Sequence, residues 1–222
     1  MARRTYSSPV RDAAAAARRA QVLEVAERLL READNAAAVA METVAAAAGV
    51  TRLTVYKQFG SRRGLLEAVF DHRAAQGGLS RLPEAMAIDD PRQGLDRLVE
   101  IFCAFWGGDP AVGRLQAMAA SDPEFAETVD ARNERRRQAI QVLLARIGGP
   151  ERIPKSGNQA GRRRDAVDLI FTLTGYATYR SLKRNRSDAE VCALLKAACA
   201  SALDPGPDAR GTAAGSLESP SR

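Results

Sequence analysis

The feature that most constrains the fold of this chain is the segment 41–63, where two short helical patterns flank a tight turn. Small apolar residues repeat at helical spacing up to Gly49, which stands where a helix end favours positive φ. Thr51 can then cap the second helix with its hydroxyl. Val55 and Phe59 lie four residues apart on the inner face of that helix. Two short helices joined by a glycine turn predict a helix-turn-helix unit, which places its second helix in the DNA major groove.

The outer face of the second helix, residues 52–59, supplies residues that we predict to contact DNA. Tyr56 offers a neutral hydroxyl donor and Lys57 a positive charge, and both suit contacts with the phosphate backbone. Thr51 and Arg62 each lie at a helix N-terminus, where the helix dipole favours a nearby phosphate. We expect these residues to position the protein on the duplex.

Other residues of the same face are candidates for reading bases. Arg52 and Gln58 have the length and donor geometry to bond base edges, typically guanine for Arg and adenine for Gln. Thr54 suits either a base or a phosphate contact, and Leu53 suits the methyl group of thymine. The structural alternative for each predicted DNA-binding residue is a solvated position on a helix.

The order of residue types along this segment also forms a family signature. A helix rich in small residues leads into AGVTRLTVYKQF, and SRRGLL follows. This arrangement, over residues 21–70, resembles the DNA-binding signature of the TetR family of transcriptional regulators. The matching positions are Ala48, Gly49, Val50, Thr51, Tyr56, Phe59, Ser61, Arg62, Leu65 and Leu66.

The segment departs from the family pattern at a few positions. Ala40 stands where the family usually has a threonine that caps the following helix. Arg63 replaces the usual glutamate, and Leu53 occupies a position that is commonly Gly, Ala or Pro. The departures leave the helical pattern intact, although Ala40 should weaken one cap by about 1 kcal/mol.

The resemblance implies an all-α transcriptional regulator. Its fold would be an N-terminal three-helix DNA-binding domain followed by a helical domain for ligand binding and dimerisation, in which the last two long helices pair with their copies. A small ligand would tilt the fourth helix and release DNA. We therefore expect a homodimeric repressor of a palindromic operator on double-stranded DNA. The alternatives are a same-fold activator or DNA-organising protein that needs no ligand, and an all-helical interaction module without a DNA role.

The composition fits a cytoplasmic helical protein. Of 222 residues, 45% are hydrophobic, 27% charged and 5% aromatic. An odd number of cysteines, Cys103, Cys192 and Cys199, without a secretory signal is typical of a reducing compartment. No apolar run is long enough for a transmembrane helix, so we expect no membrane contact. The net charge of +6 suits a polyanionic partner such as DNA.

Helix start signals organise the rest of the chain. A helical pattern over residues 15–33 should brace the helix-turn-helix unit, and a fourth helix runs from Ser61 to about Gln76, closed by the Gly and Pro residues between 77 and 83. Ser187 and Glu190 form a capping box before the last helix. Three more helices open with Asp followed by Pro, at Asp90, Asp109 and Asp122.

These signals predict about nine helices and four regions of the chain. Residues 148–164, rich in Gly, Pro and Arg, are expected to form a loop before a helix over 165–183. The arginines of the N-terminal arm are either solvated or touch phosphates or the minor groove. The regions are a flexible basic arm (1–14), a DNA-binding domain (15–66), a helical regulatory and dimerisation domain (67–203) and a disordered tail (204–222).

Apolar residues between 90 and 147 suggest where a small effector would bind. Their side chains suit a largely apolar ligand of unknown identity, and ordinary core packing is the alternative for each. The candidate ligand-binding residues are Phe102, Phe105, Trp106, Met118 and Phe125.

The sequence shows no catalytic or metal-binding pattern. His72, the single histidine, most simply packs at or near the surface, and it lies in no His-rich metal-binding motif. No glycine-rich phosphate loop is present, and acidic residues fall mostly at helix starts, where they offset the helix dipole. We therefore expect no enzymatic activity, cofactor or bound metal.

Overall fold

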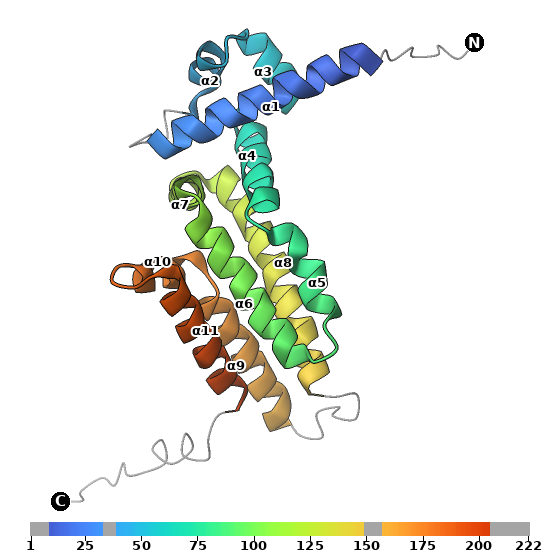
Figure 1. Cartoon of the computed structure of the whole chain (residues 1–222), viewed down its shortest axis with the longest axis vertical. Helices are drawn as coiled ribbons and strands as arrows, with labels where there is room; N and C mark the ends of the chain where they lie inside the picture. Colours follow the sequence, from blue (N-terminus) through green and yellow to red (C-terminus); the bar gives the residue numbers. More distant parts are fainter. Residues whose placement is uncertain (1–8, 33–38, 149–156, 205–222) are drawn as a thin grey trace, which may run out of the picture.

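The computed structural model describes residues 9–32, 39–148 and 157–204, and its described secondary structure is entirely helical. Figure 1 shows an elongated molecule with a small helical domain at one end and a larger helical bundle at the other. The all-α expectation is confirmed. None of the helices described is long and apolar enough to cross a membrane. The first four helices are α1 (Pro9–Glu32), α2 (Met41–Ala47), α3 (Arg52–Phe59) and α4 (Arg62–Gln76).

Helix α1 braces the small domain. Its buried residues Val22, Ala26 and Leu30 pack into a core shared with Val44 of α2 and Val55 of α3. Helices as short as α2 and α3 are marginally stable in isolation, so the core that they share with α1 stabilises them.

Helix α1 begins at Pro9, six residues before the predicted start. Proline is well suited to the first helical position, since its missing N–H would have no partner there, and the alanines that follow are strong helix formers. Residues 9–14, predicted to belong to a flexible arm, are therefore helical. The rest of the predicted arm, residues 1–8, lies outside the described residues, as does Asn35, the predicted helix stop.

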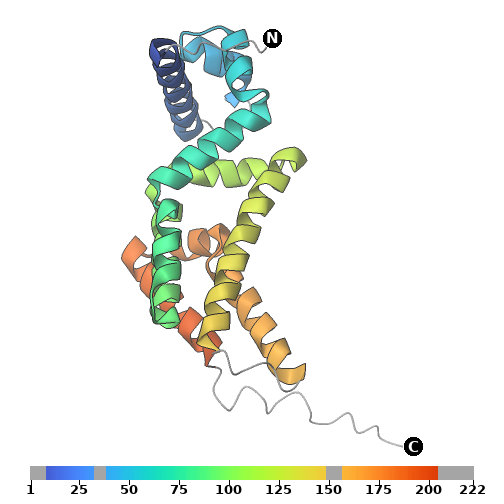
Figure 2. The same ribbon diagram turned by 90° about the vertical axis from the view of Figure 1, so that its right-hand side faces the viewer.

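Helix α4 connects the small domain to the bundle (Figure 2). Ser61, where the sequence placed the start of this helix, caps it by accepting a hydrogen bond from the N–H of Gly64 at 3.0 Å. Leu65 and Leu66 are fully buried near its start, and Phe70 packs edge-on against Phe105 of the bundle. One rigid element thus contacts both parts of the molecule.

The bundle contains the remaining helices. Figure 1 shows the long helices α6, α8, α9 and α11 lying alongside one another, with the short α7 packed beneath α1. Phe105 and Phe125 are fully buried between them, and each burial stabilises the fold by roughly 2–3 kcal/mol. These helices are α5 (Leu82–Ala87), α6 (Pro91–Gly108), α7 (Pro110–Ala119), α8 (Pro123–Ile147), α9 (Gly157–Leu173), α10 (Tyr176–Lys183) and α11 (Asp188–Leu203).

The predicted helix starts are confirmed. Asp90, Asp109 and Asp122 each accept a hydrogen bond from a backbone N–H in the first turn of their helix, with Pro next to the cap. Ser187 and Glu190 form the predicted capping box at α11. These signals are local, because the capping side chain and the backbone it satisfies are at most three residues apart.

The described residues form eleven α-helices rather than about nine. Pro83, predicted to close the fourth helix, instead lies in the first turn of α5, where proline is tolerated. Residues 157–164, predicted to belong to a loop over 148–164, instead form the start of α9, which begins at Gly157. Residues 149–156 lie outside the described part of the chain.

The predicted helix over 165–183 is broken between α9 and α10. Thr174 accepts a hydrogen bond at its carbonyl from Nε1 of Trp106 (3.0 Å), and at its hydroxyl from the buried Arg136 (3.0 Å). Arg136 also donates to the carbonyl of Phe171 at 3.0 Å. Burial, followed by the nearby charge of Arg137, lowers the pKa of Arg136 to about 10, so it stays protonated at neutral pH. Backbone carbonyls at the end of α9 thus accept hydrogen bonds from side chains of α6 and α8.

Candidate nucleic-acid interface

The turn between α2 and α3 has the geometry predicted for it. Gly49 has φ +64°, which strains residues other than glycine, and the N–H of Val50 bonds the carbonyl of Ala45 at 3.0 Å. Thr51 caps α3 by accepting from the N–H of Thr54 at 3.2 Å. These contacts fix the direction of α3 relative to α2.

Two residues of α1 hold the helix pair from behind. Gln21 donates to the carbonyl of Ala48 at the end of α2 (3.1 Å), and Arg19 donates to the carbonyl of Gln58 near the end of α3 (2.9 Å). The Arg19 guanidinium also lies 4.3 Å from the ring centroid of Phe59, a cation–π contact. Sequence reasoning did not assign these bracing roles, because the partners lie 27 and 39 residues away.

One face of α3 is open to solvent. Leu53 is 59% exposed and Tyr56 57% exposed, although most large hydrophobic side chains of the described residues are covered. Thr51, Arg52 and Lys57 are also exposed. An apolar, an aromatic and two cationic side chains therefore share a surface around one helix, with Val55 and Phe59 anchored behind them.

Arg52 is held by an acidic neighbour on that face. Its Nε lies 2.8 Å from a carboxylate oxygen of Glu42 on α2, and both side chains are largely exposed. Such exposed pairs are weak, so Arg52 can exchange this partner for another anion at little cost. Within α2 and α3, Glu42 is the acidic residue that forms an ion pair with a predicted DNA-binding residue.

Three of the predicted DNA-binding residues are half-buried, and their role in DNA binding stays a prediction. Thr54 is half-buried and shares a hydrogen bond with the Thr51 hydroxyl at 2.9 Å. Gln58, predicted on the outer surface, is half-buried, and its buried Oε1 has no hydrogen-bond partner among the described residues. Arg62 pairs with Asp122, the cap of α8, at 2.8 Å. The pairing of Arg62 with the cap of α8 is a contact that a single helix pattern does not reveal.

A cluster of charged residues joins the small domain to the bundle. Arg31 of α1 and Arg73 of α4 both pair with Asp109, the cap of α7, and Arg73 also pairs with the buried Glu27 of α1 at 3.1 Å. Nδ1 of His72 lies 2.6 Å from Oε1 of Glu27, and the His72 side chain is partly exposed, as expected for a residue near the surface. We call Glu27, Arg31, Arg73 and Asp109 the Asp109 latch.

The surroundings of Asp109 favour its charged form. Burial by itself would raise the pKa of Asp109, but hydrogen bonds from Arg31 and from the N–H of Ala111, together with the charge of Arg73, outweigh it and lower the pKa. One sequence signal pointed to this latch. Glu27 is an acidic residue beside the apolar stripe of α1, and it is buried in the structure, where a charge requires a partner.

A second set of polar contacts joins α4 to α8. Besides the Arg62–Asp122 pair, the hydroxyl of Thr128 donates to Glu67 at 2.6 Å, and this bond followed by that from Arg63 lowers the pKa of Glu67. Helix α4 begins directly after α3. The bonds between α4 and α8 therefore link the position of α3 to the bundle.

The candidate ligand-binding residues lie in the bundle core. The rings of Phe105 and Trp106 have centroids 4.8 Å apart, and Phe102 stacks on Trp106 at 5.9 Å. This is the packing expected of an ordinary core, and a ligand role for these residues stays a prediction. All five are buried: Phe102, Phe105, Trp106, Met118 and Phe125.

Comparison with known proteins identifies the small domain. Residues 22–69 match the family model described as bacterial regulatory proteins, tetR family. The chain is also 34% identical over 113 residues to the HTH-type transcriptional regulator EthR of Mycolicibacterium smegmatis. That alignment covers 50% of this chain and 51% of EthR, so the chain spans about half the length of this curated relative.

Solved structures share the fold over nearly the whole chain. A transcriptional regulator of the TetR/AcrR family from Thermobifida fusca has a TM-score of 0.58 and 20% identity, over 85% of this chain and 97% of the other. A cysteine mutant of the TetR family regulator CifR, solved with 26-bp operator DNA, has a TM-score of 0.55 and 17% identity, over 90% and 98% of the two chains. At these identities the similarity shows the fold alone.

Proposed function

From the premise that residues 22–69 belong to the TetR family of bacterial regulatory proteins, we propose that this chain binds double-stranded DNA and regulates transcription. The observation that carries the proposal is the exposed face of α3, where Tyr56 and Lys57 project away from a buried anchor. A phenol and an ammonium on one exposed helix face suit phosphate contacts that position a helix in the major groove.

Base reading falls to the neighbouring residues. Arg52 reaches guanine after leaving Glu42, and Leu53 contacts a thymine methyl. Thr51, at the N-terminus of α3, binds a phosphate with help from the helix dipole. Thr54, Gln58 and Arg62 require a local rearrangement to reach DNA, because they are half-buried or paired.

The functional unit in this proposal is a homodimer. One helix-turn-helix unit makes few contacts, and two copies whose α3 helices lie about 34–36 Å apart enter successive major grooves. The dimer contact is formed by α9 and α11, where Leu169 is 49% exposed and Leu194 is 41% exposed. The operator is then palindromic, because it mirrors the symmetry of the dimer.

Regulation is by a small ligand bound in the bundle. A ligand among Phe102, Phe105 and Trp106, with Met118 and Phe125, would favour one spacing of the two α3 helices over the other. The requirement is a differential affinity of the ligand for the two spacings. Helix α4 transmits the change, and release of DNA relieves repression.

The proposal is tested by selecting DNA from the source genome. Purified protein is mixed with fragmented genomic DNA, and the retained fragments are sequenced. A short palindrome upstream of particular genes supports the proposal, and a reporter carrying it separates repression from activation. Retention without sequence preference that disappears with added salt favours a DNA-organising protein, and no retention contradicts DNA binding.

A further inference from the structure

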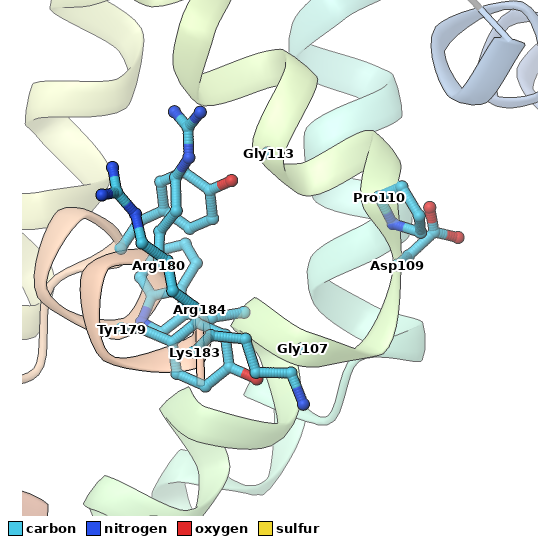
Figure 3. A pocket seen from close by; sticks show the side chains of 10 residues that line it. Gly107, Asp109, Pro110, Gly113, Tyr179, Arg180, Lys183 and Arg184 are labelled. Carbon is cyan, nitrogen blue, oxygen red and sulfur yellow. The ribbon is translucent and has the colours of Figure 1, made fainter. Parts of the chain in front are cut away.

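A groove of about 290 Å³ lies between the junction of α6 with α7 and the short helix α10 (Figure 3). Of the five candidate ligand-binding residues predicted from the sequence, Trp106 lines this groove, and Phe102, Phe105, Met118 and Phe125 do not. Such a volume is at the small end of ligand pockets in proteins, so the groove suits a small molecule.

The floor of the groove is aromatic. The rings of Trp106 and Tyr176 lie with centroids 5.6 Å apart at an angle of 60°, and Tyr179 continues this surface. Two glycines of the bundle make room for the phenols, since a Cβ at Gly113 would collide with the Tyr176 hydroxyl and one at Gly107 with the Tyr179 hydroxyl. These flat rings can stack on a planar group of a ligand.

The rim of the groove is cationic. Arg180, Lys183 and Arg184 are spaced so that α10 presents them on one side, and Figure 3 shows both arginine side chains extending in the same direction from the helix. Lys183 pairs with Asp188 at 2.7 Å. No carboxylate of the described residues forms an ion pair with Arg180 or Arg184. Their guanidinium groups are therefore available to an anion.

The acidic residue of the lining, Asp109, does not offset this charge. In Figure 3 its carboxylate points away from the groove, and it is paired with Arg31 and Arg73 in the Asp109 latch. The groove thus combines an aromatic floor with two guanidinium groups that have no acidic partner among the residues that the structure describes. An arginine fork matches a phosphate or carboxylate in shape and charge.

We propose that this groove binds a small anion with a flat apolar group, of the aryl phosphate or aryl carboxylate class. The ring stacks on Trp106 and Tyr176, and Arg180 and Arg184 bind the anionic group. This differs from the largely apolar effector expected from the sequence, because the groove adds a requirement for negative charge.

The groove adjoins the Asp109 latch through one residue. Asp109 and Pro110 line a wall of the groove, and the Asp109 carboxylate also holds α1 and α4. A ligand that shifts this wall changes how the small domain is held. This consequence for DNA affinity rests on the proposed function, whereas the binding itself does not.

The binding experiment uses Trp106 as its own reporter, since it is the single tryptophan of the chain. Its emission, excited beyond the absorption of the ligands, is followed while phenyl phosphate is added to the full chain. We expect a saturable change with phenyl phosphate. Benzyl alcohol provides the ring without the charge and inorganic phosphate the charge without the ring, and both should bind at least about tenfold more weakly.

The charge requirement is tested with matched double variants. Arg180→Gln with Arg184→Gln should weaken phenyl phosphate binding about tenfold or more. Arg135→Gln with Arg186→Gln removes two charges from exposed positions outside the groove and should leave binding within about twofold. All four positions are exposed, and thermal unfolding checks that each variant folds.

Several results would overturn the assignment. They are benzyl alcohol binding as tightly as phenyl phosphate, equal loss in both double variants, and no saturable change at all. These readouts need no DNA, so they can fail while the proposed function stands. In a separate titration with selected DNA, phenyl phosphate should change the affinity of the wild type, and an unchanged affinity despite binding overturns the link to the latch.

Discussion

Arg31 of α1 binds the carboxylate of Asp109 in a two-pronged contact, with Nε 3.1 Å from Oδ1 and Nη2 2.8 Å from Oδ2. The two residues are 78 positions apart, and Asp109 also caps α7. A single carboxylate therefore fixes a helix start in the bundle and the bracing helix of the small domain. This contact makes the junction between the two parts a specific place to test.

Replacing Asp109 with Asn should loosen that junction. Asn keeps the cap of α7, but it loses the charge that Arg31 and Arg73 share and leaves the two cations with Glu27 as their remaining partner in the latch. We expect the free energy of unfolding in urea to fall by about 2 kcal/mol. The matched control is Asp90→Asn at the exposed cap of α6, which should change it by less than about 0.5 kcal/mol. Equal losses in both variants would contradict a special role for the latch.

The contribution of Asp109 should depend on pH. Its pKa lies below the ordinary value of 3.8, so the folded state binds this proton less readily than the unfolded state. The stabilisation is then complete above about pH 5 and is lost as the pH falls through 3.8 and below. The stability difference between wild type and Asp109→Asn should shrink over this range in urea unfolding. A difference that stays constant down to about pH 2 would show that the charge of Asp109 is not its source.

Removing the acid beside Arg52 should tighten DNA binding. Glu42→Gln frees Arg52 and removes a negative charge near the phosphates, and because the pair is exposed the gain should be about two- to fivefold. Fluorescence anisotropy with a selected DNA fragment measures the change in Kd. Glu84→Gln, which removes a similar charge from an exposed pair with Arg81 in the bundle, should have no effect. Weaker binding by Glu42→Gln would argue against contact between Arg52 and DNA.

The dimer surface can be tested without DNA. Leu169→Glu with Leu194→Glu places two charges on the exposed apolar positions of α9 and α11, and should convert a dimer to a monomer in analytical ultracentrifugation. Val142→Glu changes a comparably exposed residue of α8 and should leave the dimer intact. A double variant that remains dimeric would place the interface elsewhere.

Features set by neighbouring residues in the sequence were predictable. The caps at Thr51, Ser61 and Asp109 depend on backbone groups two or three residues away, and Gly49 adopts the positive φ that was predicted for it. The helix-turn-helix unit follows from these signals and from the buried spacing of its apolar residues.

Features set by distant partners were not predictable in the same way. Arg62 was predicted to contact a phosphate, but its side chain bonds Asp122, which lies 60 residues further along the chain. The helix break at Thr174 has one local signal, Gly175, but the donors that satisfy the Thr174 carbonyl and hydroxyl come from α6 and α8, far away in the sequence. The groove beside α10 arises from that break, and it was therefore hidden from sequence reasoning.

The central claim is that the exposed face of α3 binds DNA, and one comparison tests it directly. Wild type and the double variant Tyr56→Phe with Lys57→Ala are each mixed with the same fragmented genomic DNA, and the retained palindromic sites are counted by sequencing. Both side chains are exposed, so the variant should keep the stability and oligomeric state of the wild type. We expect enrichment of those sites to fall by about tenfold or more. Equal enrichment by a folded variant would show that α3 is not the surface that contacts DNA.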